Sequence, residues 1–317
     1  MKSAITILSF ILFLIFSCKP EKSNIVTLNT TSKAKVVNTA ANKGVTSSAV
    51  TNEAFNAYWY SGKAELSSYV LKQARYNEIR TGEVVLIFVT EPFSLSKQVK
   101  LDHAEQAGAD KVTVMKLNQI RKFNTGIYDY SIVTSTFTPI DFTNHPLTLK
   151  ATTSIQEWCG HTFTQLNLDD NQYHFKLFSY FEADGDEERK LNAALLEEDL
   201  MTRIRIHSGQ LPIGELQLIP STIYSRFNYK KMQAHTAEIS KTETETAFAY
   251  TINYLDIDRT LSIEVEKEFP YKILEWTEDS GDGFITTATL KSSLNEPYWN
   301  QKSVADEAKR EALQLIK

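Results

Sequence analysis

The chain has 317 residues, of which 42% are apolar, 34 are Lys or Arg and 39 are Asp or Glu. This composition is typical of a folded domain with a sizeable core, and it excludes a disordered or collagen-like chain. A net charge of −5 without a long basic stretch argues against a nucleic-acid partner. Two cysteines, Cys18 and Cys159, are too few for a disulfide framework or a cysteine metal site.

The first residues have the organisation of a secretion signal. Lys2 supplies a positive charge, and residues 4–16 form an apolar run with the length of a signal-peptide core, too short for a comfortable bilayer span. Residues 14–18 (LIFSC) resemble the lipobox of bacterial lipoproteins, with a small residue directly before Cys18. The large Phe16 departs from the commonest form of this motif.

The lipobox implies that residues 1–17 are a signal peptide and that Cys18 is acylated as the mature N-terminus, which attaches the chain to a membrane. Lys19 in the second mature position resembles sorting to the outer membrane, so the expected localisation is the cell envelope. Cleavage removes one lysine and no acid, which leaves 33 bases against 39 acids and a charge of −6. The alternative is an uncleaved anchor or an ordinary secretory signal with a chance cysteine.

Residues 18–52 predict a lipidated N-terminus followed by a flexible tether, because they are polar and lack both aromatic residues and periodicity. Such a coil has a root-mean-square reach on the order of 30 Å. Residues 53–317 are expected to form one β-rich domain, which could divide into two sub-layers. Its aromatic start, residues 53–60, is expected at an edge of the core.

The first strands are predicted over residues 62–77 and 82–91, with a turn near residues 80–82. Residues 84–89 (VVLIFV) are apolar at every position, which is typical of a strand buried on both faces. A second pair is predicted over residues 111–122 and 127–138. A three-residue turn at 124–126 would set Arg121 opposite Asp129.

Residues 147–181 predict a β-hairpin around a turn of acidic and amide residues. If Leu168 faces Tyr173, then Phe163 faces Phe178, because antiparallel partners keep a constant sum of residue numbers. One face of this hairpin is mostly apolar and the other is mixed. The mixed face carries Phe163, Phe178 and Tyr180, which we interpret as the lining of a ligand cleft.

In the C-terminal half, residues 191–206 have helical spacing and predict an internal helix. Strand signals follow at residues 214–219, 223–229, 233–240, 244–254, 260–269, 271–278 and 284–291. Residues 303–306 resemble a capping box with Asp in place of Glu, which predicts a C-terminal helix to Ile316. About fourteen strands at hairpin spacing predict an all-β fold, mainly an antiparallel sandwich or open barrel with one internal helical segment and a C-terminal helix.

The residues around Cys159 invite two catalytic interpretations, and neither is favoured. The sequence W-C-G-H resembles a thioredoxin-like motif, but Thr162 stands where the resolving cysteine is needed. His161 shares a face with Cys159 and Glu182 lies opposite, yet residues two apart on a strand are roughly 7 Å apart, too far for direct proton transfer. Cys159 is therefore interpreted as a strand cysteine packed against its neighbours.

Other chemistry-bearing patterns are missing from the sequence. The remaining histidines have no HxH or HExxH spacing, and the acidic residues 184–188 and 278–283 do not fit the twelve-residue calcium loop. Neither a Walker A motif nor a dinucleotide glycine pattern nor G-x-S-x-G is present. No metal, cofactor or catalytic residue is expected.

Four stretches of the mature region are distinctive: YWYSGKAELSSYVLKQARYNEIR, EVVLIFVTEPFS, TGIYDYSIVTSTFTPI and SIQEWCGHTFTQ. They resemble a group of uncharacterised bacterial lipoproteins that are sometimes labelled septum formation inhibitor Maf. True Maf nucleotide pyrophosphatases carry an early S-x-S-P-R-R-type motif, which is absent here. No Maf site residue is therefore carried over.

The resulting hypothesis is a lipid-anchored cell-envelope protein without enzymatic activity, whose β-rich domain binds or carries an apolar or amphipathic molecule. A barrel of more than about eight strands has an interior too wide for side chains to fill, which would leave room for such a ligand. The main alternative is a scaffold, filled by its own side chains, that contacts envelope proteins or glycan. An enzyme ranks behind both, because it would need convergent polar groups with perturbed pKa values in one pocket.

Overall fold

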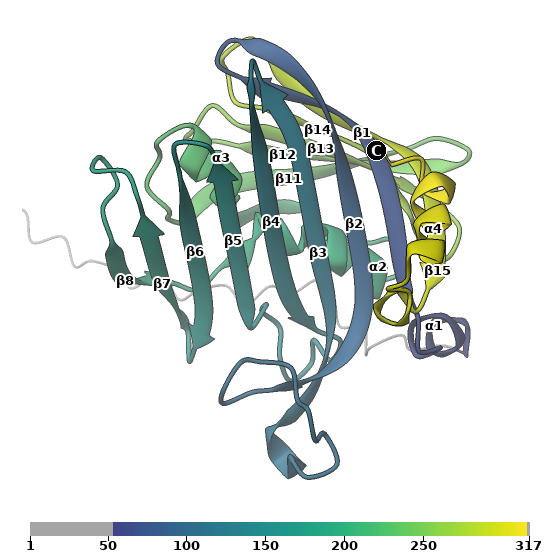
Figure 1. The fold of residues 1–317 in the computed structure, drawn as a ribbon. Helices are drawn as coiled ribbons and strands as arrows, with labels where there is room; N and C mark the ends of the chain where they lie inside the picture. The colour runs from purple at the N-terminus through teal and green to yellow at the C-terminus, as the bar shows by residue number, and fades with distance from the viewer. Residues whose placement is uncertain (1–52, 316–317) are drawn as a thin grey trace, which may run out of the picture. The chain divides into compact units, whose positions relative to one another are not determined.

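A single sheet dominates the part of the chain that the computed structural model describes, residues 53–315. Within these residues, fifteen strands are ordered β8-β7-β6-β5-β4-β3-β2-β1-β15-β14-β13-β12-β11-β10-β9 (Figure 1). Neighbouring strands of this sheet pair antiparallel except β9 with β10. The predicted all-β, mainly antiparallel fold class is confirmed.

The strands are β1 (Ala64–Arg75), β2 (Glu78–Ser94), β3 (Lys111–Thr125), β4 (Tyr128–Pro139), β5 (Lys150–Glu157), β6 (Gly160–Asp169), β7 (Gln172–Ser179), β8 (Glu187–Asn192), β9 (Leu195–Leu196), β10 (Gly214–Ile219), β11 (His235–Glu243), β12 (Ala247–Tyr254), β13 (Thr260–Glu266), β14 (Ile273–Asp279) and β15 (Ile285–Glu296). The α-helices are α1 (Glu53–Trp59), α2 (Leu200–Ile206), α3 (Thr222–Phe227) and α4 (Ala308–Ala312). Short 3-10 turns are η1 (Gly108–Asp110), η2 (Glu197–Asp199), η3 (Tyr298–Asn300) and η4 (Val304–Glu307).

The sheet curls until its two edge strands meet. β8 ends at Asn192 and β9 begins at Leu195, so a two-residue link joins opposite edges of the sheet. Leu196 of β9 and Ile219 of β10 pack in one buried cluster with Tyr173 of β7. Strongly twisted sheets of more than about ten strands rarely remain open, and they usually curl, split into two layers or flatten. This sheet curls. The result is an open barrel.

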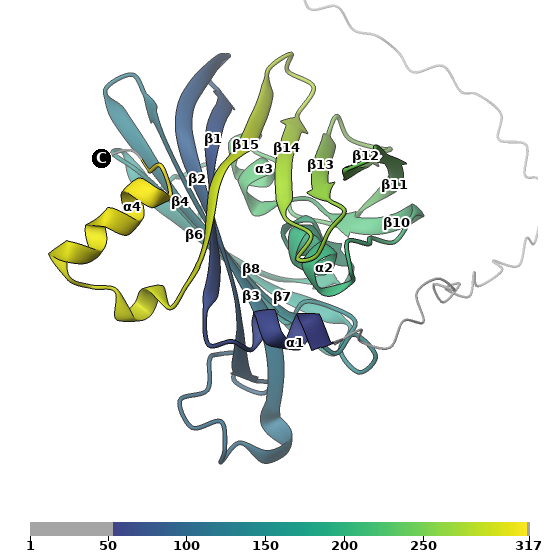
Figure 2. The same cartoon turned by 90° about the vertical axis from the view of Figure 1, so that its right-hand side faces the viewer.

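Helix α2 fills the concave side of the curled sheet (Figure 2). All seven of its residues are buried. Leu200 and Ile204 belong to the main core cluster, together with Leu86 of β2 and Ile263 of β13 from the two halves of the sheet. The open barrel therefore wraps around one of its own helices.

The turn between β1 and β2 lies earlier than predicted. Tyr76 and Asn77 form it, with φ values of 55° and 56°, as a two-residue type I′ hairpin requires at both positions. Gly82 instead lies within β2, where an added Cβ would come 2.2 Å from the carbonyl oxygen of Lys122. The glycine thus permits close approach of β3 and does not mark a turn.

The register predicted for β3 and β4 is wrong by three residues. Asn124, and not Arg121, lies opposite Asp129, because a two-residue turn connects these strands. Arg121 lies opposite Ile132 and points into the interior, where it is paired with Glu278. Cross-strand charge matching misled the prediction because the partner of Arg121 comes from a strand 157 residues away.

The register predicted for β6 and β7 is confirmed, since Leu168 faces Tyr173 and Phe163 faces Phe178. The first arm of the predicted hairpin is in fact two strands, β5 and β6, because the chain turns at Trp158.

The helical segments differ from the prediction in several places. The internal helix is shorter than residues 191–206, because the first part of that range forms the end of β8, then β9 and η2. Residues 223–229 were predicted as a strand but form α3, whose N-terminus is capped by Ser221 through a 3.0 Å bond from the amide of Tyr224. Residues 53–60, for which only a position at an edge of the core was expected, include the helix α1. The capping box at Ser303 and Asp306 is confirmed, although the helix after it ends at Ala312; Ile316 lies outside the described residues.

Candidate functional site

Buried arginine–carboxylate pairs occupy the interior. They are Arg121 with Glu278, Arg203 with Asp199, Arg205 with Glu65, and Arg259 with Glu197. Each guanidinium is almost completely shielded from solvent. A buried charge is tolerated only when it is paired and hydrogen-bonded, so each of these side chains is needed by its ion-pair partner.

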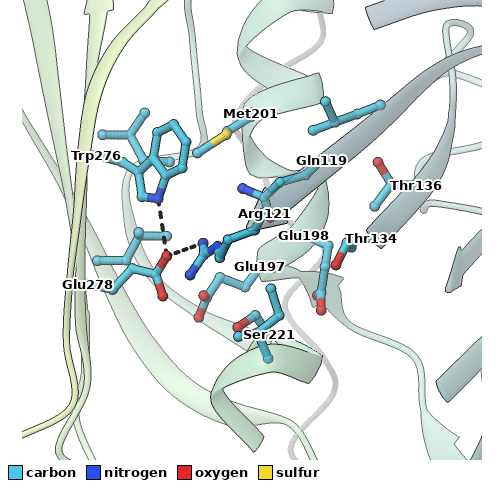
Figure 3. Close-up of a pocket in the computed structure, with 14 residues that line it drawn as sticks. Gln119, Arg121, Thr134, Thr136, Glu197, Glu198, Met201, Ser221, Trp276 and Glu278 are labelled. Atoms are coloured by element: carbon cyan, nitrogen blue, oxygen red, sulfur yellow. Dashed lines mark hydrogen bonds and ion pairs between the residues drawn. The ribbon is translucent and has the colours of Figure 1, made fainter. Parts of the chain in front are cut away.

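A small cavity with several polar lining residues lies beside the Arg121–Glu278 pair and Glu197 (Figure 3). Its volume is about 50 Å³, which is room for a few water molecules and not for an organic ligand. Glu278 accepts hydrogen bonds from Arg121 (2.7 Å) and from the indole of Trp276 (3.1 Å). Burial opposes ionisation, but the cations of Arg121 and Arg259 nevertheless lower the pKa of Glu278.

Glu198 is the carboxyl group of this cavity that no arginine neutralises. Its Oε1 accepts hydrogen bonds from the amide (2.5 Å) and hydroxyl (2.9 Å) of Thr222, whereas its Oε2 is buried and has no partner within residues 53–315. Burial raises the pKa of Glu198 to about 7. The cavity therefore contains a carboxyl group that changes charge near neutral pH, without space for a substrate beside it.

A larger hollow lies on the outer face of the sheet, beneath the C-terminal segment, residues 297–315. After β15 this segment arches away from the sheet and returns through α4 (Figure 2). The groove that it covers has a volume of about 370 Å³. Sites for small organic ligands begin at about 300 Å³, so the groove is large enough for one.

The groove has an apolar lining and a charged rim. The apolar lining comprises Leu66, Val85, Ile87, Ile120, Leu294, Tyr298, Leu313 and Leu315. The charged residues are three acids and three bases, Glu83, Glu296, Asp306, Lys122, Lys309 and Arg310. Because the rim charges balance, the groove carries no net charge from these side chains, and its lining offers an apolar surface.

Both hydrogen bonds and apolar contacts hold the C-terminal segment over the groove. Leu313 belongs to a buried cluster with Leu66, and its carbonyl oxygen accepts a bond from Ser68. The hydroxyl of Ser292 donates to the carbonyl of Ala312 (2.8 Å). At the other end of α4, Lys309 pairs with Glu296 at 2.6 Å. The groove is thus roofed by a segment fixed at defined points.

The residues predicted to line a cleft lie elsewhere. Phe163, Phe178 and Tyr180 are on the outer face of β6 and β7, because the opposite face of β6, with Thr162 and Leu166, is buried. Phe178 and Tyr180 are exposed, and the three residues line neither the interior cavity nor the groove. They form a surface group, which differs from the predicted enclosed lining.

Cys159 is exposed in the turn between β5 and β6, so the interpretation as a packed strand cysteine is wrong. Hydrogen bonding to Glu157 and the charge of that carboxylate raise the pKa of the thiol, which disfavours a reactive thiolate. Cys18, the predicted lipidation site, lies outside the described residues.

One sequence signal pointed to the groove. The run at residues 84–89 is apolar at every position, yet only Val84, Leu86 and Phe88 face the core. The alternate residues Val85 and Ile87 face outward and form the groove floor. An apolar outer face on a strand indicates a cover, but the identity of that cover, a segment more than two hundred residues later, had no local signal.

No three His, Cys, Asp or Glu side chains within residues 53–315 come together so that they could hold a metal ion. Among the described helices, none combines the length and the apolar character that crossing a bilayer requires.

No family model matches the chain, and no curated protein matches it. A solved structure, that of the β-barrel-like protein of domain of unknown function DUF1849 from Brucella abortus, aligns with a TM-score of 0.42 and 12% identity. The alignment covers 73% of this chain and 96% of that one.

Proposed function

We propose that this chain is a lipid-anchored cell-envelope protein, without catalytic activity, that binds a single-chain amphiphile in the groove beneath residues 297–315. The observation that carries the proposal is the combination of an apolar groove of about 370 Å³ with a charged rim. Burying an acyl chain there would contribute roughly 0.8 kcal/mol for each methylene group. The head group would remain among the rim charges and in contact with water.

The interior is a poorer place for such a ligand. Helix α2 and its ion pairs fill it, and the cavity that remains is about 50 Å³. The small volume of this cavity also supports the proposal of a non-enzymatic role, because no organic substrate fits beside its carboxyl groups. Two of these groups, those of Glu197 and Glu278, are in addition paired with arginines. The amphiphile is therefore assigned to the outer groove.

The lipid anchor of the proposal rests on the sequence around Cys18, LIFSC, and on the resemblance of the mature region to bacterial lipoproteins. An acylated Cys18 would hold the domain at the membrane, where amphiphiles with a single chain are available. We infer the outer membrane from Lys19, as in the sorting rule that the sequence resembles.

Titration with a dansylated fatty acid tests the binding proposal on the chain from residue 53 onward. We expect saturable binding, and we expect Val85→Gln to weaken it about five- to thirtyfold, since a polar group on an apolar floor costs about 1–2 kcal/mol. The matched control is Val133→Gln, because Val133 faces outward from β4 and does not line the groove. Equal affinities of the two variants would contradict the assignment to this groove.

A further inference from the structure

Exposed aromatic side chains gather at one end of the barrel, which we call the upper rim. They lie in or beside the connections that follow β1, β5, β7 and α3, and they are Tyr76, Trp158, Tyr180 and Tyr229. Trp158, Tyr180 and Tyr229 are each about two-thirds exposed or more, at 66%, 71% and 67%. These connections lie at the upper end of the strands in Figure 1, whereas α1 lies at the lower end. The rim is thus separate from the start of the folded domain.

Three hollows meet at the upper rim around the end of α3. Their volumes are about 370, 270 and 310 Å³, and Tyr229 lines all of them. Arg75, Tyr76 and Phe227 are shared by the first two, and Arg226 is shared by the last two. The hollows therefore surround one aromatic corner and are separate from the groove beneath residues 297–315.

Arg75 is the cation at the centre of this corner. Its guanidinium carbon lies 4.2 Å from the ring centroid of Tyr76 and 4.2 Å from that of Phe227. It donates to the carbonyl of Phe227 (3.0 Å) and to the hydroxyl of Tyr76 (3.2 Å), which in turn is 2.8 Å from the hydroxyl of Tyr130. The side chain is thus held in a fixed position by neutral partners.

No carboxylate in the described part of the chain forms an ion pair with Arg75. Arg226 differs, because Asp184 neutralises it at 3.3 Å. A guanidinium has five N–H donors; Nη1 and Nη2 of Arg75 each donate one of the bonds above, and its buried Nε has no hydrogen-bond partner within residues 53–315. A positioned arginine with free donors and no counter-charge is suited to a planar anion such as a carboxylate.

We propose that the upper rim binds an anionic saccharide. Sugar rings present a face of C–H groups that stacks on aromatic rings. Tyr229 offers such a ring beside all three hollows, and the exposed Trp158 offers one next to Glu157 and Cys159 of the second hollow. A carboxylate or phosphate on the sugar would bind Arg75. The polar groups that line the first hollow, including those of Asn77 and Asn228, would bind the sugar hydroxyls.

A membrane surface is a poorer partner for the same rim. Glu157, Asp184 and Asp282 line its hollows, and insertion into a bilayer would remove water from these carboxylates. A hydrated saccharide leaves them solvated. The proposal is independent of the groove, since the two sites share no lining residue.

Calorimetric titration of the full-length chain, in a non-ionic detergent, with trigalacturonic acid tests the inference, with the neutral trimer of N-acetylglucosamine as the uncharged probe. We expect saturable binding of the acidic trimer that weakens with added salt, and weaker binding of the neutral one. Arg75→Gln should reduce the affinity for the acidic trimer at least tenfold. Tyr229→Ala, a surface change that does not touch the core, should also reduce it.

The matched control is Tyr60→Ala, because Tyr60 is a 48%-exposed tyrosine beside α1 at the other end of the strands. Its affinity should equal that of the unmodified chain. The proposal would be overturned by the absence of saturable binding, by equal affinities for the two trimers, or by full affinity in both rim variants. Quenching of Trp158 by brominated phosphatidylglycerol in proteoliposomes, lost in Trp158→Phe, would also overturn it, since the rim would then be a membrane contact.

Discussion

Replacement of Glu65 by alanine should be among the most destabilising single changes in this protein. The carboxylate lies in the interior and accepts hydrogen bonds from Arg205 of α2 and from Tyr58 (2.6 Å). Arg205 is fully buried, and within residues 53–315 its Nε and Nη1 atoms have no hydrogen-bond partner. Loss of Glu65 would leave this cation without a counter-charge.

The expected cost follows from the surroundings of Arg205. Breaking a buried ion pair by removing one partner costs about 3–5 kcal/mol. The rings of Phe88 (4.8 Å) and Trp59 (5.2 Å) still face the guanidinium, and such contacts are worth about 2 kcal/mol when desolvated. We therefore place the cost of Glu65→Ala at about 3 kcal/mol, a large share of the 5–15 kcal/mol typical of a domain.

Urea unfolding followed by circular dichroism measures this cost from the midpoint and the slope. The double variant Glu65→Leu with Arg205→Leu provides the comparison, because replacing both partners by apolar groups is often close to neutral. We expect the double variant to be more stable than Glu65→Ala. Two results would show that Glu65 is not needed to neutralise the buried Arg205. One is a loss of less than about 1 kcal/mol in the free energy of unfolding of Glu65→Ala, and the other is a double variant that is less stable than Glu65→Ala.

Three further predictions concern single side chains. The folded-state pKa of Glu198, about 7, lies above its ordinary value of 4.5. The contribution of Glu198 to the free energy of unfolding is therefore present below pH 4.5 and is lost as the pH rises through 7. Glu198→Gln should raise the melting temperature at pH 8 and leave it unchanged at pH 4, and the reverse pattern would refute the raised pKa. Cys18→Ala should leave an unprocessed precursor or release the protein from membranes, as fractionation and mass spectrometry would show; normal processing with membrane retention would exclude the lipobox. Cys159→Ser should leave both the melting temperature and any cellular phenotype unchanged, because the thiol is exposed in a turn; loss of function in the folded variant would restore the nucleophile hypothesis.

Features that depend on neighbouring residues could be predicted from the sequence. The alternation of Thr162, Leu166 and Phe175 with polar residues fixed the register of β6 and β7, because a one-residue slip would expose the apolar face. The capping box at Ser303 was readable for the same reason, since its donors and acceptors are three residues apart.

Features that depend on distant residues could not be predicted. Arg121 and Arg205 look like surface residues in the sequence, because their partners Glu278 and Glu65 lie 157 and 140 positions away. The groove could not be predicted for the same reason, since most of its floor and all of its roof are contributed by segments from opposite ends of the domain. The aromatic residues of the upper rim are likewise brought together only by the order of the strands in the sheet.

Photolabelling of the chain with a diazirine fatty acid tests the assignment of an amphiphile to the outer groove most directly. After irradiation and digestion, mass spectrometry identifies the labelled peptides, and an excess of unlabelled fatty acid should suppress their labelling. We predict labels on the floor and roof of the groove, at Val85, Ile120 and Leu313 or their immediate neighbours. Labels confined to α2 and the inward face of β13, or labelling that the excess fatty acid does not suppress, would contradict the account.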